Sequence, residues 1–148
     1  MQTENIVTAA EFLQRGEKPC DYEMQLLRDK ERIQAIFDGK IIPPYELEIQ
    51  TTAVCNLKCG HCFGRDYERI KPQMTKSQIQ TLGKRIEDFV EGEYRITVVK
   101  FCGTTGEPLL NPTTLYGIDL FKEMGKAVVV YTNGLFLDRK HRDGHAYL

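Results

Sequence analysis

Residues 46–62 read ELEIQTTAVCNLKCGHC, in which a short alternating segment runs directly into a loop that contains three cysteines. Leu47 and Ile49 alternate with polar residues, which is the pattern of a β-strand with one buried face. We therefore predict a strand over residues 45–51. Because the loop follows at once, this strand would carry the cysteines at its carboxyl end.

The three cysteines are Cys55, Cys59 and Cys62, and their spacing is C-x-x-x-C-x-x-C. A thiolate is both a soft metal ligand and a nucleophile, so the spacing indicates metal capture or disulfide exchange, unless it is coincidental. A tight loop that contains glycine can turn all three sulfurs around one inorganic centre. Most iron–sulfur clusters and structural zinc sites have four protein ligands, so three cysteines imply either a distant fourth ligand or one open metal position.

A structural zinc site is the alternative that the residues leave open, with Cys102 as its fourth ligand because it ends a later predicted strand. Zinc loops typically have a second pair of cysteines, which this sequence lacks. Otherwise Cys20 and Cys102 are expected to be structural, buried thiols. Five cysteines, three of them bunched, fit reduced thiols and a metal better than a disulfide framework.

The composition is that of an ordinary soluble globular domain, with 41% hydrophobic and 28% charged residues in a chain of 148. Twenty basic and 21 acidic residues give a net charge of −1, which provides no electrostatic basis for binding nucleic acid or an anionic membrane. The sequence shows no secretion signal and no apolar stretch of the roughly 20 residues that span a bilayer. A cytoplasmic location is expected.

Helical signals flank the predicted strand on both sides. Apolar residues recur near the helical period over residues 8–38, so residues 1–44 are interpreted as an N-terminal helical extension. Downstream, Thr75 and Gln78 make a capping-box signature for a helix that Gly92 is predicted to end. The stripe of buried residues expected on that helix comprises Ile79, Leu82, Ile86, Phe89 and Val90.

The rest of the chain continues the alternation of strands and helices. Residues 96–101 are a short apolar run rich in β-branched residues, as expected for a strand of a parallel sheet that is buried on both faces. Asn111-Pro112 reads as the N-cap and first position of a helix that Gly125 ends, and residues 127–131 form a third strand. This order favours parallel βαβ units, so the predicted fold class is α/β. The loops after the three strands would then share the edge of the sheet where such folds bind ligands.

With the cysteine motif, the other two loops make the chain resemble the radical S-adenosylmethionine (SAM) superfamily. In that family the C-x-x-x-C-x-x-C loop follows the first strand of a βα barrel. Its second strand ends in a Gly-Gly-Glu-Pro motif, often continued by Leu-Leu-Asn-Pro, and residues 105–112 read TGEPLLNP, with Thr105 where the first glycine usually stands. Residues 131–134, YTNG, are similar to the Thr-Asn-Gly found after a later strand of these enzymes.

The resemblance implies a partial (βα) barrel of the radical SAM type over residues 45–148, with about the first three βα units. It also implies that the three cysteines hold a 4Fe-4S cluster and that SAM chelates its open iron. One-electron cleavage of SAM would give a 5′-deoxyadenosyl radical, which abstracts hydrogen from an unidentified substrate. The cofactor-binding residues that the resemblance implies are Gly106, Glu107, Thr132, Asn133 and His61.

Partners and alternatives follow from the same comparison. Reductive cleavage of SAM needs a low-potential electron donor such as a flavodoxin or ferredoxin. The strand at residues 127–131 is almost wholly apolar and no further strand follows Gly134, so we expect a fragment of a longer enzyme, or a second chain that completes the barrel.

The alternative function is a truncated, non-catalytic iron–sulfur or zinc-binding module that docks onto a partner protein. His141 and His145 lie in a charged tail and are expected to be solvated.

Overall fold

The computed structural model describes residues 29–64, 66, 73–103 and 105–137. The chain divides into two compact units, Met1–Ile42 and Pro43–Leu148. Within the described residues, no helix is long and apolar enough to cross a membrane. Predictions for residues 8–28, Cys20, His141 and His145 fall outside the described part of the chain.

The described helix of the first unit is α3 (Lys30–Phe37), whose N-cap position is Asp29. Ala35 is its buried residue, whereas Phe37 is 79% exposed. The carboxyl-terminal part of the segment predicted to be helical, residues 8–38, therefore forms a helix.

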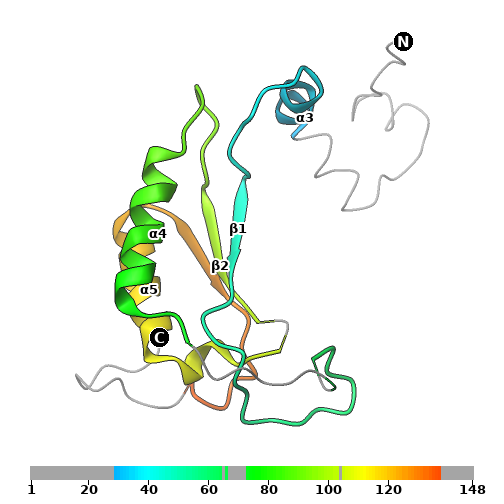
Figure 1. Cartoon of the computed structure of the whole chain (residues 1–148), viewed down its shortest axis with the longest axis vertical. Helices are drawn as coiled ribbons and strands as arrows, with labels where there is room; N and C mark the ends of the chain where they lie inside the picture. Colours follow the sequence, from blue (N-terminus) through cyan, green and yellow to red (C-terminus); the bar gives the residue numbers. More distant parts are fainter. Residues whose placement is uncertain (1–28, 65, 67–72, 104, 138–148) are drawn as a thin grey trace. The chain divides into compact units, whose positions relative to one another are not determined.

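The second unit contains a sheet of three parallel strands in the order β1-β2-β3, which confirms the predicted α/β fold class (Figure 1). A helix connects each strand to the next, because parallel neighbours need a crossover from one end of the sheet to the other. The strands are β1 (Glu46–Ile49), β2 (Val98–Phe101) and β3 (Ala127–Val130), and the crossover helices are α4 (Lys76–Asp88) and α5 (Pro112–Glu123).

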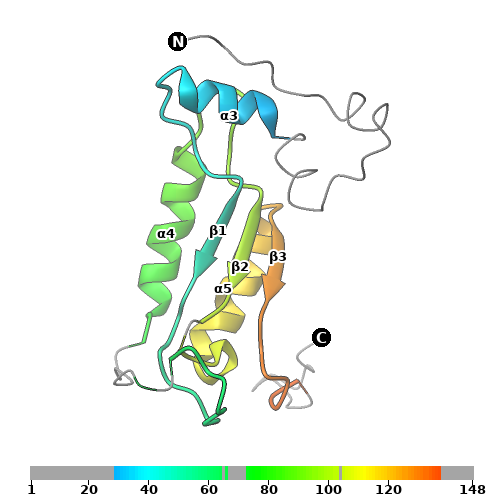
Figure 2. The same ribbon diagram turned by 90° about the vertical axis from the view of Figure 1, so that its right-hand side faces the viewer.

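Both crossover helices lie on one face of the sheet, and the core forms between them and the strands (Figure 2). The rings of Phe101 and Phe121 lie 6.0 Å apart at its centre. Gly117 lets α5 approach β2, since an added Cβ there would lie 2.6 Å from Cζ of Phe101. The buried core residues are Ile49, Ile79, Ile86, Ile96, Val99, Phe101 and Phe121.

The opposite face of the sheet carries charged residues on β1 and β2. Glu46 lies opposite Val98 in the register, and the Nζ of Lys100 lies 2.5 Å from the Glu46 carboxylate and 3.8 Å from that of Glu48. Among the described residues β2 therefore alternates between a buried and a half-buried face. The prediction that this strand is buried on both faces is wrong, because Lys100 lies on the half-buried face and forms an ion pair with Glu46 there.

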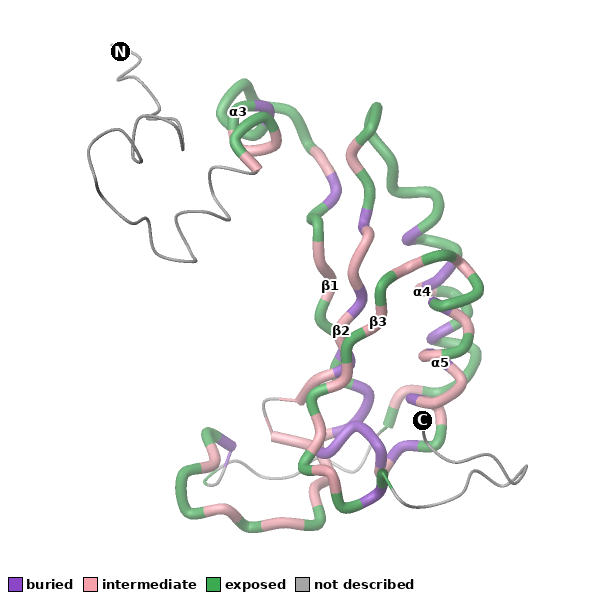
Figure 3. Tube along the Cα trace, turned by 180° about the vertical axis from the view of Figure 1, so that it is seen from behind, coloured by how far each residue is buried: buried purple, intermediate pink, exposed green. Residues whose placement is uncertain are grey.

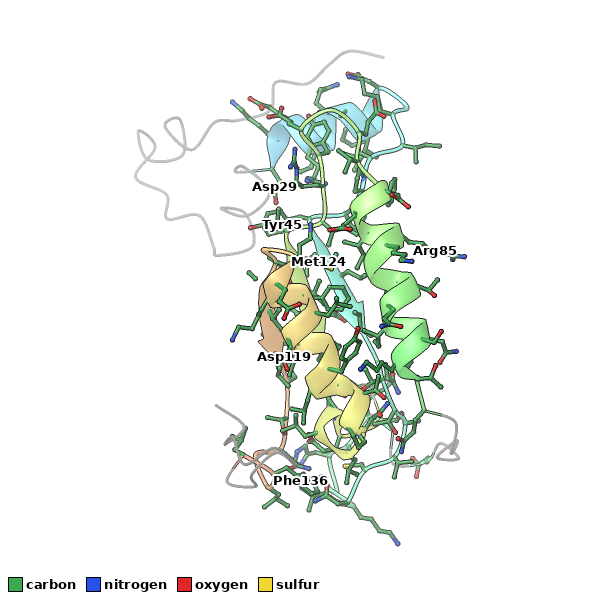
Figure 4. All side chains as sticks on the ribbon, turned by 90° about the vertical axis from the view of Figure 1, so that its left-hand side faces the viewer. Asp29, Tyr45, Arg85, Asp119, Met124 and Phe136 are labelled. Atoms are coloured by element: carbon green, nitrogen blue, oxygen red, sulfur yellow. The ribbon has the colours of Figure 1, made fainter. Side chains whose placement is uncertain are left out.

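Helix α4 begins as predicted and ends earlier. The Thr75 hydroxyl accepts a hydrogen bond from the Gln78 N–H, and the Gln78 side chain accepts one from the Thr75 N–H, which confirms the capping box. The last helical residue is Asp88 and not Gly92. Phe89 and Val90 are 40% and 45% exposed, so their predicted place in the buried stripe is wrong, since the backbone has left the helix there. Figure 4 shows the exposed Arg85 projecting from α4 on the side away from α5.

Helix α5 begins at the predicted cap. The Asn111 side chain accepts a hydrogen bond from the Thr113 N–H at 3.0 Å, and Pro112 is the first helical residue. Its C-cap is Met124, and Gly125 then takes a φ of 71°, which glycine adopts easily. A short 3₁₀-helix, η1 (Pro108–Leu110), precedes the cap and was not predicted.

Candidate functional site

Three loops meet at the carboxyl ends of the parallel strands, as the sequence predicts. We call residues 52–64 the cysteine loop, residues 102–111 the second loop and residues 131–137 the third loop. They follow β1, β2 and β3 respectively. Figure 3 shows buried positions continuing past the strands into this region. The loops therefore rest on a packed base.

The base of the site is a set of buried polar groups around the end of β1. The Asn111 amide donates to the carbonyl oxygens of Thr51 at 2.9 Å and Met74 at 3.0 Å. The Thr114 hydroxyl donates to the Pro108 carbonyl oxygen at 2.6 Å, so the Thr51 hydroxyl is the donor in the 2.7 Å contact between the two threonines. Thr51 and Thr114 are almost fully buried, at 1% and 0% exposed. These bonds satisfy backbone carbonyls where the sheet ladder stops.

The second loop lies directly against the start of the cysteine loop. A Cβ added at Gly106 would lie 2.0 Å from the Thr52 carbonyl oxygen, so only glycine fits at that position. The Glu107 N–H donates to the Val54 carbonyl oxygen at 2.9 Å. Gly106 is thus a point of close backbone approach between the two loops.

The Glu107 carboxylate joins the second loop to the third. Its Oε1 accepts hydrogen bonds from the Thr132 hydroxyl at 2.7 Å and from the Leu109 N–H at 3.1 Å. Its Oε2 accepts one from the Asn133 N–H at 2.8 Å. The residue is 2% exposed, so both oxygens are held by protein donors in a buried setting. Three of the five predicted cofactor-binding residues are therefore brought together by one carboxylate.

The third loop also reaches the cysteine loop. The Asn133 side-chain amide donates to Oδ1 of Asn56 at 2.9 Å, and its own Oδ1 accepts from the Leu135 N–H at 3.1 Å. Phe136 anchors the loop beneath the strand ends, where it is 8% exposed (Figure 4). Asn56 follows the first cysteine directly, so this contact ties the third loop to the candidate metal-binding segment.

The cysteines themselves are half-buried along the loop. The Cys62 N–H donates to the Cys59 carbonyl oxygen at 3.1 Å, which makes a turn between these two cysteines. The Leu57 N–H lies 3.4 Å from the sulfur of Cys55. Among the described residues, no three His, Cys, Asp or Glu side chains are gathered as a metal site. Three partly exposed thiols are a donor set of the type that an iron–sulfur cluster takes.

Two aromatic side chains of the cysteine loop point to solvent. His61, a predicted cofactor-binding residue, is exposed, and the structure brings it against none of the other four. Phe63 is 77% exposed.

Cys102 lies at the end of β2, on the same side as Lys100. Partial burial, and then the neighbouring Glu48, raise the pKa of the Cys102 thiol, while Lys100 lowers it less. The zinc alternative, in which Cys102 is the fourth ligand, is not tested by this setting and stays a prediction.

Several residues of the site were missed by sequence reasoning. Asn56 gave no signal, because one asparagine beside a cysteine is common in loops. Thr51 and Thr114 are 63 positions apart, and each lies in a segment that other residues identified, the strand predicted over residues 45–51 and helix α5. Asn111 was predicted to be a helix cap, which is correct. The hydrogen bonds from its side-chain amide to the carbonyl oxygens of Thr51 and Met74 depend on the tertiary fold, and the sequence did not predict them.

Comparison with solved structures finds a similar chain in the crystal structure of BtrN, a radical SAM enzyme, in complex with AdoMet and 2-DOIA. The two chains are 23% identical and superpose with a TM-score of 0.51 over 66% of this chain. This chain spans 38% of the BtrN chain. The likeness shows a radical SAM-like fold for the βα units. No family model and no curated protein matches the sequence.

Proposed function

We propose that this chain provides the cluster-binding and SAM-binding part of a radical SAM enzyme, with Cys55, Cys59 and Cys62 as ligands of a 4Fe-4S cluster. The observation that carries the proposal is that all three loops are bonded to one another at the carboxyl ends of parallel strands. This edge is where such sheets bind ligands. A loop with three cysteines has many uses, but its contacts with two polar loops favour a site for a cluster and a second ligand.

Each candidate residue has a definite task in this proposal. Three thiolates leave one iron free for SAM, and the bound cluster would supply the electron that cleaves its sulfonium. The buried Glu107 carboxylate would act on SAM binding by fixing Thr132 and Asn133, to which it is hydrogen-bonded. Gly106 keeps the backbone of the second loop close to the cysteine loop. The exposed His61 imidazole would lie against the adenine.

Binding of SAM is further supported by the BtrN structure, which contains AdoMet. The chemistry requires a low-potential electron donor, so we propose a flavodoxin or ferredoxin as a partner in the cytoplasm.

Anaerobic reconstitution followed by iron, sulfide and zinc analysis tests the proposal. We expect about one 4Fe-4S cluster per chain, with the brown colour and charge-transfer absorbance of such clusters. Replacing Cys55, Cys59 or Cys62 with alanine should each abolish binding. Cys102→Ala is the matched control and should retain the cluster.

Two results would contradict the assignment. Stoichiometric zinc without iron would indicate a structural zinc module. Equal loss of metal in Cys102→Ala and in the three loop variants would indicate a closed site with four cysteines. For the SAM part, the electron paramagnetic resonance spectrum of the reduced cluster should change when SAM is added, and His61→Ala should weaken that effect without loss of iron. An unchanged spectrum at saturating SAM would rule out SAM binding by the cluster.

A further inference from the structure

The last residue of the cysteine loop lies directly against Thr105 of the second loop. A Cβ added at Gly64 would lie 2.3 Å from Cγ2, 2.7 Å from Cβ and 2.9 Å from Cα of Thr105. Gly64 is buried, and its φ is not in the left-handed region. Close packing, and not backbone conformation, therefore requires glycine at this position.

The hydroxyl of the same threonine reaches back to the end of β1. The Gln50 side-chain amide donates to the Thr105 Oγ1 at 3.1 Å. Gln50 comes just before the cysteine loop, and Gly64 is its last residue. One side chain therefore contacts the chain on both sides of the loop that carries the three cysteines.

The next two residues hold the beginning of the same loop. Gly106 lies against the Thr52 carbonyl oxygen, and the Glu107 N–H is bonded to Val54. Residues 105–107 thus hold both ends of the cysteine loop. Fixing the ends of a loop reduces the conformational entropy that is lost when its side chains converge on one ligand.

We infer that Thr105 is a positioning residue, which closes the cysteine loop by packing on Gly64 before a cluster binds. The inference rests on the proposed function in assigning cluster binding as the purpose of the loop. The packing contact and its effect on the loop do not depend on a cluster. The contact also gives a physical reason for a threonine at position 105. A glycine there would leave Gly64 without the side chain that packs on it.

Hydrogen exchange of the complete chain without a cluster tests the contact. Mass spectrometry would follow a peptide that covers residues 55–64. Thr105→Gly should speed its exchange about five- to tenfold, because the loop end is released. Thr105→Val keeps the packing and loses the bond to Gln50, so its effect should be smaller.

Gly64→Ala supplies the complementary change, and Gly60→Ala is its matched control. An added Cβ at Gly60 would meet no atom within 4 Å, so that variant should exchange like the wild type. Gly64→Ala should speed exchange, because its Cβ would displace Thr105. The double variant Gly64→Ala/Thr105→Gly should recover part of the difference, since the contacts at 2.3 and 2.7 Å disappear while the approach to Cα remains.

Cluster retention provides the second readout. Reconstituted Thr105→Gly should lose iron to a chelator several-fold faster than the wild type, and Gly83→Ala, a substitution on α4 outside the three loops, should not. If Thr105→Gly leaves both exchange and iron loss unchanged, or if the two substitutions act additively, the inference is wrong. If the wild type binds no iron, the proposed function fails, and the exchange rates alone decide whether Thr105 closes the loop.

Discussion

At the scale of single residues, Glu107 combines a proposed role in SAM binding with a structural one. Its carboxylate accepts three hydrogen bonds from the protein while 2% exposed. A buried acceptor is expensive to replace, because its donors lose their partners inside the protein. Loss of SAM binding in a Glu107 variant would therefore have two possible causes, which a stability measurement separates.

Glu107→Gln should lower the free energy of unfolding by about 1–3 kcal/mol, since one carboxylate oxygen becomes an NH₂ group that faces a donor. Urea denaturation followed by circular dichroism measures this change. Glu48→Gln is the control, because the Glu48 side chain is 62% exposed and should change stability little. Equal stability of Glu107→Gln and the wild type would show that Thr132 and Asn133 do not depend on the carboxylate.

The charges around Cys102 predict opposite effects of two substitutions on its reactivity. Glu48 raises the pKa of the thiol and Lys100 lowers it. At pH 8, below the raised pKa, Glu48→Gln should increase the thiolate fraction and the rate of alkylation by iodoacetamide. Lys100→Gln should decrease both.

Peptide mapping by mass spectrometry measures alkylation at Cys102 separately from the loop cysteines. The pKa of the Cys102 thiol is higher in the folded protein than in the unfolded chain. The contribution of this thiol to the stability of the fold is therefore complete below the unfolded pKa, and it is lost as the pH rises through the folded pKa. A change of the same sign in Glu48→Gln and Lys100→Gln would contradict the electrostatic account.

At the scale of elements, two helical glycines have opposite roles. A Cβ added at Gly117 of α5 would lie 2.6 Å from Cζ of Phe101, whereas the nearest atoms to a Cβ at Gly83 of α4 are flexible side-chain ends of Leu120 and Met124 at 3.3 and 3.4 Å. Alanine is the better helix former at both sites by about 1 kcal/mol. Packing should reverse that preference only at Gly117.

We expect Gly117→Ala to destabilise the protein by about 1–3 kcal/mol through overpacking, and Gly83→Ala to change stability by less than about 1 kcal/mol. Thermal or urea unfolding monitored by circular dichroism compares the two variants directly. Stabilisation by Gly117→Ala would mean that α5 can shift away from β2 without cost.

The elements also show what the sequence can and cannot predict. Strand and helix order, the Thr75 cap and the Asn111 cap depend on neighbours within a few residues, so the pattern revealed them. The end of α4 at Asp88 depends on where the chain turns toward β2, and apolar residues beyond it misled the prediction. Periodicity also missed η1, which is too short to repeat.

The loops of the site were predicted in the same way, and their contacts were not. Residue types identified the three loops, because cysteines and glycines stand out at short spacing. Asn56 and Asn133 are separated by 77 positions, and Thr105 meets Gly64 only when β1 and β2 are aligned. Such contacts depend on register and crossover geometry, which no local pattern encodes.

At the scale of the whole molecule, the described structure predicts a gradient of local stability. The central strand β2 is paired on both sides and contains Val99 and Phe101, both 0% exposed. Native-state hydrogen exchange should be slowest there and faster in the cysteine loop. On reconstitution, added protection should be confined to the three loops, as measured by mass spectrometry. Protection spread evenly over α4 and α5 would indicate that the cluster changes global stability instead.

The bond between Asn56 and Asn133 also has a consequence for biosynthesis. The ribosome makes the cysteines first, and the contacts that Glu107 and Asn133 provide come later in the chain. Synthesis of the roughly 70 residues between Cys62, the last cysteine of the loop, and Asn133 takes several seconds at about 5–20 residues per second. During that interval the cysteine loop of the nascent chain lacks its contacts with Glu107 and Asn133. If the thiols bind a cluster as proposed, metal delivery or protection from oxidation would be needed most before β3 has left the ribosome.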